Sequence, residues 1–194
     1  MIIDVSTYQG DIDWLKVSQS GVQKVILRTT LKSGNLDPRF MKNYNGILQN
    51  TNEVMKELDM YKFSYARDYV SAYMEAVRTF QTLIIHGVRL QTFDFFWLDL
   101  EAWNGRDYTT EEANAVLHGY EIAASKYDVK LGLYCNYNYI KHIIDPYWRI
   151  LPLWIARYNK TLGDIEPFDA YMWQYTDKGE VDGIPAKVDM SRYV

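Results

Sequence analysis

Several features that mark particular protein classes are scarce in this 194-residue chain. It has one cysteine, Cys135, which excludes an internal disulfide, and we expect this residue to be a small buried hydrophobe rather than a nucleophile. Its three histidines show no metal-ligand spacing, so we expect no metal and no other cofactor. No apolar run approaches the ~20 residues of a membrane span. These scarcities argue against disulfide-rich, zinc-binding and transmembrane proteins.

Positive charge is also sparse. Lys and Arg number 21 against 25 Asp and Glu, a formal net charge of −4, and no basic block occurs. The composition therefore argues against nucleic acid or a membrane surface as the partner. The segment Met1–Val5 lacks the basic and apolar layout of a signal peptide, so we expect cytoplasmic synthesis with a different release route, or a leader already removed. With no linker or repeat, residues 1–194 are expected to form one domain and a monomer.

Aromatic residues, in contrast, are abundant: 17 Tyr, 7 Phe and 6 Trp. Flat rings with a polar edge suit sugars, whose C–H faces stack on them while the hydroxyls bond to their edges. The tyrosine content therefore favours a carbohydrate ligand.

One stretch stands out, the apolar run from Phe95 that ends in two acids, Asp99 and Glu101. The run is typical of a strand buried on both faces, and strand alternation places Trp97 and both acids on one face. Paired buried carboxylates repel each other and are costly to desolvate. Such a pair suits glycoside hydrolysis, in which one acid donates a proton and its neighbour stays ionised. The alternative is a strand end with two solvated surface acids.

The rest of the chain alternates strands with helices and then changes. Apolar and β-branched patterns predict strands at 1–6, 24–30, 60–66, 95–101, 131–137, 153–158, 171–175 and 188–190. Helices are expected at 13–17 with Asp13 as cap, from Asp37-Pro38 onward, at 70–88, at 113–127 behind a Thr109–Glu112 capping box, and at 138–144. Residues 50–58 are ambiguous between a helical piece and irregular chain. The pattern predicts an α/β fold, a trimmed barrel with five βα units and three final strands without helices, since a full barrel needs about 250 residues.

In such barrels reactive groups lie at the carboxyl ends of the strands. Asp4 ends the first expected strand, and Asp189 lies on the last, which must adjoin the first if the barrel closes. Together with Asp99 and Glu101 they would surround one mouth. Six further residues end other strands and are candidates for substrate binding: Arg28, Tyr61, Tyr65, Tyr134, Trp154 and Trp173. The alternative for the aromatic residues is core packing, and the alternative for Arg28 is that it neutralises one of the acids.

Six short motifs are spread along the whole length of the chain. They are Asp4-Val5-Ser6-x-x-Gln9-Gly10, Tyr61-Lys62-Phe63-Ser64-Tyr65-Ala66, Leu98-Asp99-Leu100-Glu101, Pro152-Leu153-Trp154-Ile155-Ala156, Trp173-Gln174-Tyr175-Thr176 and Val188-Asp189-Met190. In this order they resemble the motifs of the glycoside hydrolase family 25 lysozymes, the Chalaropsis-type N-acetylmuramidases of phage endolysins and bacterial autolysins. The resemblance implies a flattened barrel of five βα units and three final strands.

The resemblance also implies an activity, cleavage of the β-1,4 bond between N-acetylmuramic acid and N-acetylglucosamine in the bacterial cell wall. By position, Glu101 would be the general acid, Asp99 would stabilise the developing charge, and Asp4 and Asp189 would be supporting acids. Retention and inversion of configuration both stay open. Two alternatives remain, a hydrolase of another N-acetylhexosamine polymer such as chitin, and a non-catalytic wall-binding module. The presence of Glu101 counts against the module.

Overall fold

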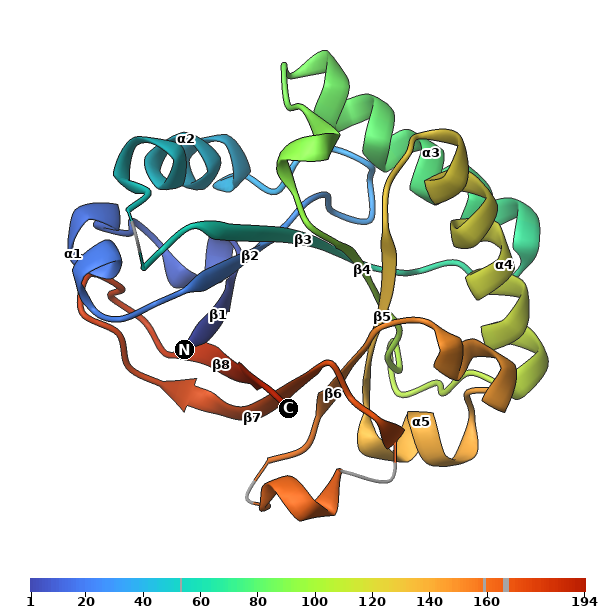
Figure 1. Cartoon of the computed structure of the whole chain (residues 1–194). Coiled ribbons are helices and arrows are strands. Elements are labelled where there is room, and N and C mark those ends of the chain that lie inside the picture. Colours follow the sequence, from blue (N-terminus) through green and yellow to red (C-terminus); the bar gives the residue numbers. More distant parts are fainter. Residues whose placement is uncertain (53, 159, 166–167) are drawn as a thin grey trace.

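The computed structural model describes residues 1–52, 54–158, 160–165 and 168–194, and its centre is a closed barrel (Figure 1). The strands follow one another around the ring in chain order, and the last returns to the first. They are β1 (Ile2–Val5), β2 (Lys24–Arg28), β3 (Glu57–Phe63), β4 (Phe96–Asp99), β5 (Leu131–Asn136), β6 (Leu153–Ala156), β7 (Met172–Gly179) and β8 (Val188–Tyr193). The predicted eight-stranded α/β barrel is confirmed.

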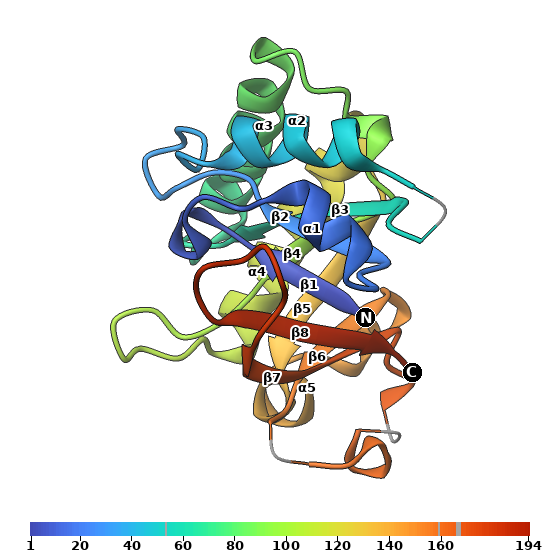
Figure 2. The same ribbon diagram turned by 90° about the vertical axis from the view of Figure 1, so that its left-hand side faces the viewer.

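Helices cover the outside of most of the ring. They are α1 (Trp14–Gln19), α2 (Phe40–Asn50), α3 (Tyr69–Ile85), α4 (Thr110–Lys126) and α5 (Tyr137–His142), with short 3-10 turns at Thr7–Gln9, Leu90–Thr92, Pro146–Ile150 and Leu162–Asp164. Figure 1 shows no α-helix outside β7 and β8, and in Figure 2 these strands lie at the surface facing the viewer. The chain therefore trims its barrel on this side, as the strand and helix count predicts.

The last strand differs from the other seven in direction. β1 to β7 pair in parallel, whereas β8 is antiparallel to both β7 and β1. Only a loop joins β7 to β8, and a connection without a crossover gives an antiparallel pair. Because β8 pairs with β1, Asp189 becomes the direct partner of Asp4.

Two apolar layers pack on the two faces of the barrel wall. Side chains that point inward, among them Ile26, Trp97 and Met172, fill the barrel interior. Side chains that point outward, such as Phe96 and Leu98, pack beneath the helices. The alternation expected along β4 is therefore confirmed.

Two of the helix starts predicted from capping residues are confirmed, and a third is wrong. Asp13 caps α1 and the Thr109–Glu112 capping box forms, as expected. The expected start at Asp37 is wrong, because α2 begins at Phe40. The carboxylate of Asp37 instead accepts hydrogen bonds from the amides of Thr7 (3.1 Å) and Arg39 (2.9 Å), and so ties the turn before α2 to the β1 loop.

The segment around residue 55 also differs from expectation. β3 begins at Glu57, three residues before the predicted strand, and ends at Phe63. No helix continues beyond Asn50 in the described residues 51–52 and 54–56, while Glu53 lies outside the described residues. The local pattern left residues 50–58 ambiguous, and pairing with β2 extends the strand backward to Glu57.

A buried ion pair closes the end of the barrel where the parallel strands begin. The Lys24 ammonium lies 3.0 Å from a carboxylate oxygen of Asp59, and both side chains are almost fully buried, at 1% and 0% exposure. Asp59 also accepts hydrogen bonds from the indole of Trp97 (2.8 Å) and the amide of Phe95 (3.0 Å). These bonds satisfy the carboxylate and fix the Trp97 ring across the barrel interior.

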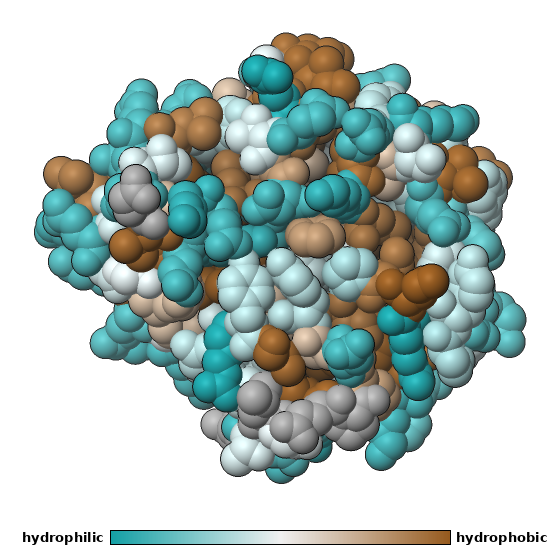
Figure 3. All heavy atoms as spheres, viewed as in Figure 1, coloured by the Kyte–Doolittle hydropathy of each residue, from teal (hydrophilic) through white to brown (hydrophobic). Residues whose placement is uncertain are grey.

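The described residues contain no helix that could cross a membrane. On the face shown in Figure 3, the apolar surface is divided into separate patches among hydrophilic side chains.

Replacing Lys24 should strongly destabilise the barrel. Lys24→Met leaves the Asp59 carboxylate buried without its cation, which typically costs about 3–5 kcal/mol. Urea unfolding followed by circular dichroism measures this loss. The matched control is Lys130→Met, at an exposed lysine just before β5, which should change stability by less than about 0.5 kcal/mol. Equal stability of the two variants would show that the pair contributes little.

Candidate active site

A cavity of about 190 Å³ opens at the carboxyl ends of the parallel strands. Every strand except β2 contributes a side chain directly or through the residue that follows it. The lining residues are Asp4, Tyr61, Asp99, Glu101, Tyr134, Trp154, Gln174 and Asp189. The four acids named from the sequence therefore lie together in one cavity, with three of the six candidate binding residues.

The acids differ in depth. Asp4 and Asp99 are buried, at 7% and 6% exposure, whereas Glu101 and Asp189 are half-buried. Asp99 is the last residue of β4 and Glu101 lies two positions beyond it, on the same side of the chain. The Asp99 Oδ1 atom makes no hydrogen bond to any described residue. The cavity therefore has deep carboxyls and a more accessible Glu101.

Burial raises the pKa of all four acids, and repulsion from neighbouring carboxylates adds to this effect. Burial raises the pKa of Asp99 well above its usual value, with additional contributions from Glu101 and Asp4, and Arg28 opposes this shift. Burial also raises the pKa of Glu101, and the charge of Asp189 adds to it. Burial and the charge of Asp189 raise the pKa of Asp4 well above its usual value. The cavity therefore favours proton retention, the property required of a general acid near neutral pH.

A hydrogen-bond network that sequence reasoning missed positions Asp4. The amide nitrogen of Gln174 donates to Asp4 (2.9 Å), while its oxygen accepts from the hydroxyls of Tyr134 (2.8 Å) and Tyr158 (2.7 Å). Two hydroxyl donors on the oxygen fix the amide so that its nitrogen faces Asp4. Gln174 therefore lowers the Asp4 pKa against the effect of burial.

The period-two alternation of strand side chains predicts part of this hydrogen-bond network from the sequence. Tyr158 lies four residues after Trp154, so in an extended chain both side chains point to the same face of the sheet. The same rule separates Trp173 from Gln174, but the sequence Met172-Trp173-Gln174 does not show which residue faces inward. The pairing of Trp154 with Met172 on β6 and β7 decides it.

Two of the candidate binding residues lie outside the cavity but near it. The guanidinium of Arg28 donates to the hydroxyl of Tyr65 (3.3 Å), and its charge opposes the upward shift of the Asp99 pKa. Neither Arg28 nor Tyr65 lines the acid cavity itself. They form a second layer beside Asp99.

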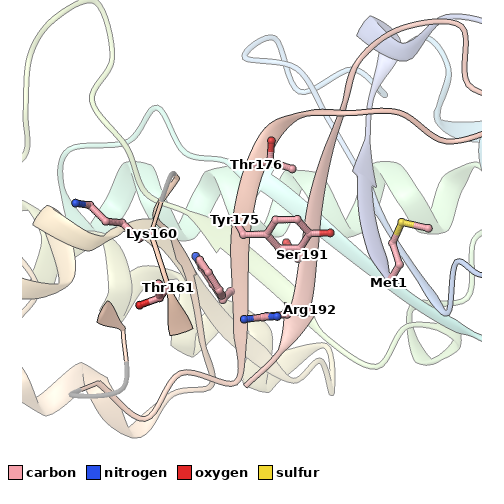
Figure 4. A pocket seen from close by; sticks show the side chains of 8 residues that line it. Met1, Lys160, Thr161, Tyr175, Thr176, Ser191 and Arg192 are labelled. Carbon is pink, nitrogen blue, oxygen red and sulfur yellow. The ribbon is translucent and has the colours of Figure 1, made fainter. Parts of the chain in front are cut away.

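Trp173, the remaining candidate, faces away from the acids. Its indole nitrogen donates to the carbonyl of Arg157 (2.8 Å), and the Arg192 guanidinium lies 4.7 Å from its ring. It lines a larger hollow of about 790 Å³ on the outer side of β7 and β8, where Figure 4 labels Tyr175 and Arg192. This hollow contains none of the four acids, so we place the candidate active site at the smaller cavity.

Among the described residues, no group of three or more His, Cys, Asp or Glu side chains is arranged to hold a metal ion.

Comparison with known families gives a match along almost the whole chain. The sequence profile of the glycosyl hydrolases family 25 matches residues 3–184. The chain belongs to glycosyl hydrolase family 25. The resemblance carried by the sequence motifs is thus confirmed, and so is the trimmed barrel that it implied.

Named relatives and solved structures agree with this membership. The autolytic lysozyme of Clostridium acetobutylicum is 28% identical over 98% of this chain and 55% of its own length. The modular autolysin LytC from Streptococcus pneumoniae superposes with a TM-score of 0.84 at 22% identity, over 98% of this chain and 45% of that chain. The CTP1L endolysin gives a TM-score of 0.75 at 28% identity, over 100% of this chain and 66% of that chain. The chain thus spans about half the length of the first two.

Removing the Gln174 amide should disturb turnover through Asp4. Gln174→Leu deletes a donor that lowers the Asp4 pKa, so the acidic limb of the pH–rate profile should move to higher pH. Loss of positioning should also lower kcat by about 10²-fold. The control is Gln19→Leu, at an exposed residue of α1. An unchanged pH profile in the Gln174 variant would contradict this positioning role.

Neutralising Glu101 should stabilise the fold at neutral pH. The raised pKa values mean that the folded protein holds protons more tightly than the unfolded chain, so stability falls as pH rises from the usual carboxyl range through the raised pKa values. Glu101→Gln removes one repelling charge and should add about 0.5–2 kcal/mol at pH 7, or about 2–4 °C in Tm for each kcal/mol. The gain should vanish near pH 3, where carboxyls are protonated in both proteins.

Thermal unfolding at both pH values measures this effect. Glu111→Gln is the matched control, since Glu111 is exposed in the first turn of α4 and hydrogen bonds to its carboxylate lower its pKa. That control should be slightly destabilising at pH 7. A Glu101→Gln protein that melts below the wild type at pH 7 would contradict repulsion in the cavity.

Proposed function

We propose that this chain is a lysozyme that hydrolyses the β-1,4 bond between N-acetylmuramic acid and N-acetylglucosamine and acts on bacterial peptidoglycan in the cell wall. The observation that carries the proposal is the meeting of four carboxyls in one cavity at the catalytic end of the barrel. Membership of glycosyl hydrolase family 25 supports it. Relatives named as a lysozyme, an autolysin and an endolysin agree with this assignment.

We assign proton donation to Glu101. It is the more accessible acid of the β4 pair, and burial raises its pKa. A general acid must reach the glycosidic oxygen of a polymer that lies across the cavity mouth, and the accessible acid meets this requirement better than the buried Asp99. The proton of Glu101 passes to the leaving oxygen as the C1–O bond breaks.

We assign charge stabilisation to Asp99. Breaking the bond leaves positive charge on the sugar ring, and a carboxylate beneath it stabilises that charge. The Asp99 Oδ1 atom, without a hydrogen-bond partner among the described residues, is available to the sugar or its N-acetyl group. Burial and the neighbouring acids favour the protonated form of Asp99, whereas the charges of Arg28 and Lys62 favour the ionised form that this role requires. Asp4 and Asp189 support this charge distribution from the opposite wall.

The aromatic lining suits a sugar. Trp154 packs against Tyr134 with ring centroids 4.4 Å apart, and Tyr61 lies across the cavity on β3. We propose that these three residues contact the substrate ring. Water then takes the place of the leaving sugar oxygen, its proton returns to Glu101, and its hydroxyl becomes the new reducing end.

The decisive experiment digests purified peptidoglycan, reduces the new ends with borohydride and identifies them by mass spectrometry. Reduced muramic acid supports the proposal. Reduced glucosamine would contradict the assigned bond, and the absence of new reducing ends with protein bound to the wall would favour a binding module. Nuclear magnetic resonance of the fresh product anomer tests this route as well, because water that returns its proton to Glu101 gives retention, and an inverted anomer would contradict that step.

Glu101→Gln should lose most turnover while keeping the fold and wall binding, because a positioned acid contributes about 10²–10⁴-fold. Reducing-end release and a wall pull-down measure the two properties separately. Glu111→Gln, which removes an exposed acid outside the cavity, should retain wild-type turnover. Near-normal lysis by Glu101→Gln would end its assignment as the acid.

A further inference from the structure

A second cavity, of about 250 Å³, lies between the loop after β2 and helix α3. Its charged lining consists of Lys32, Lys62 and Arg78 with one acid, Glu75, and we call it the basic pocket. Three cations against one acid leave an excess positive charge there. The pocket has no part in the hydrolytic steps described above.

The single acid of the basic pocket is already engaged. The Glu75 carboxylate accepts hydrogen bonds from the Ser64 hydroxyl (2.8 Å), the Tyr120 hydroxyl (2.7 Å) and the Tyr65 amide (3.1 Å). It also lies 3.6 Å from the Lys62 ammonium. Glu75 therefore balances Lys62 and has little capacity for the other cations.

Lys32 and Arg78 are the available cations. Both are exposed, and neither forms an ion pair with any described residue. Lys62, in contrast, is almost fully buried, and burial lowers its pKa to about 8. An anion in the pocket would contact two unpaired charges at its rim and favour the charged form of a third at its floor.

Tyr65 contacts two lysines of the basic pocket and also Arg28, which lies beside the acid cavity. Its ring lies 5.5 Å from the Lys32 ammonium and 4.7 Å from that of Lys62, while its hydroxyl accepts the bond from Arg28. The Tyr65 ring also meets the Trp103 ring edge-on, with centroids 5.0 Å apart. The Lys32 ammonium lies 5.4 Å from the Trp103 ring as well.

These contacts place the basic pocket beside the acid cavity. Trp103 follows Glu101 by two residues, and Arg28 links Tyr65 electrostatically to Asp99. A polymer bound at the acids therefore has an aromatic bridge and then a cationic pocket at its side. The acid cavity on one side and the unpaired cations on the other make the local electrostatic potential uneven, which orients a substrate whose own charge is unevenly distributed.

Peptidoglycan has such a distribution. Its glycan chain of N-acetylated sugars is uncharged, and its anionic groups are the carboxylates of the stem peptide attached to the muramic acid lactyl group. We propose that the basic pocket binds a carboxylate of the stem peptide, with Lys32 and Arg78 as specificity-determining residues. The inference rests on the proposed lysozyme function. It also supplies a physical reason for selecting peptidoglycan over chitin, which has no such anion.

The test compares two soluble substrates, one with stem peptides and one without them or any other free carboxylate. The first is a preparation of uncrosslinked glycan strands with their stem peptides. The second is the same preparation after an amidase has removed the stems and the lactyl carboxylate left on each muramic acid has been capped as its methylamide. Reducing-end release gives kcat and KM for each. The variants are Lys32→Gln, Arg78→Gln and the double substitution, with Lys130→Gln as the control for loss of a positive charge at the other end of the barrel.

We expect the double variant to lose about 10–100-fold in kcat/KM on stem-bearing strands, mostly through KM, because two charge-assisted contacts disappear. The loss on stripped strands should be at least tenfold smaller. Lys130→Gln should retain the wild-type preference. An equal loss on both substrates would assign the pocket a structural or glycan-binding role and overturn the proposal, as would an unchanged preference.

A direct binding measurement separates this proposal from the proposed activity. A synthetic stem tetrapeptide is titrated into Glu101→Gln protein, and binding is followed by calorimetry at low and high salt. Binding that weakens with salt and disappears in Glu101→Gln combined with Lys32→Gln and Arg78→Gln supports the basic pocket. No binding to the Glu101→Gln protein overturns it, whereas absence of new reducing ends with wild-type protein would reject the lysozyme function alone.

Discussion

The pairing of β8 with β1 is the contact on which the site depends. It closes the barrel, and its register makes Asp4 and Asp189 direct partners across two strands that lie at opposite ends of the chain. Closure also sets β4 across the interior from this pair, so that Asp99 and Glu101 complete the cavity. A slip of one residue in this register would turn Asp189 to the outer face of β8.

Charged side chains are paired with opposite charges at one end of the barrel and lie beside like charges at the other end. At the end where the parallel strands begin, Lys24 and Asp59 neutralise each other, and Trp97 donates to the same carboxylate. At the other end the carboxyls of the acid cavity repel, and the only fixed donor to Asp4 is a neutral amide from Gln174 among the described residues. Ion pairing with Lys24 therefore balances the acids at one end of the barrel, while the acids at the other end have raised pKa values, which favour holding a proton for chemistry.

The sequence predicted those features that depend on local periodicity. Alternation along β4 put Asp99 and Glu101 on one face, and the Thr109 capping box marked the start of α4. The predictions from the sequence failed where a contact between distant segments competes with a local pattern. Asp37 has the features of a helix cap, but bonding to the amide of Thr7 pulls it into a turn, and pairing with β2 starts β3 at Glu57.

The sequence by itself determined the eight strands, the trimmed helical cover, the four acids and the family, because these follow from patterns within short segments and from their order. Only the tertiary structure decided which residue of a strand faces the cavity. It turned Trp173 outward and Gln174 inward, and it placed the basic pocket beside Tyr65. The physical reason is that the facing of a strand depends on its register with its neighbours, and that register is fixed only when the ring closes.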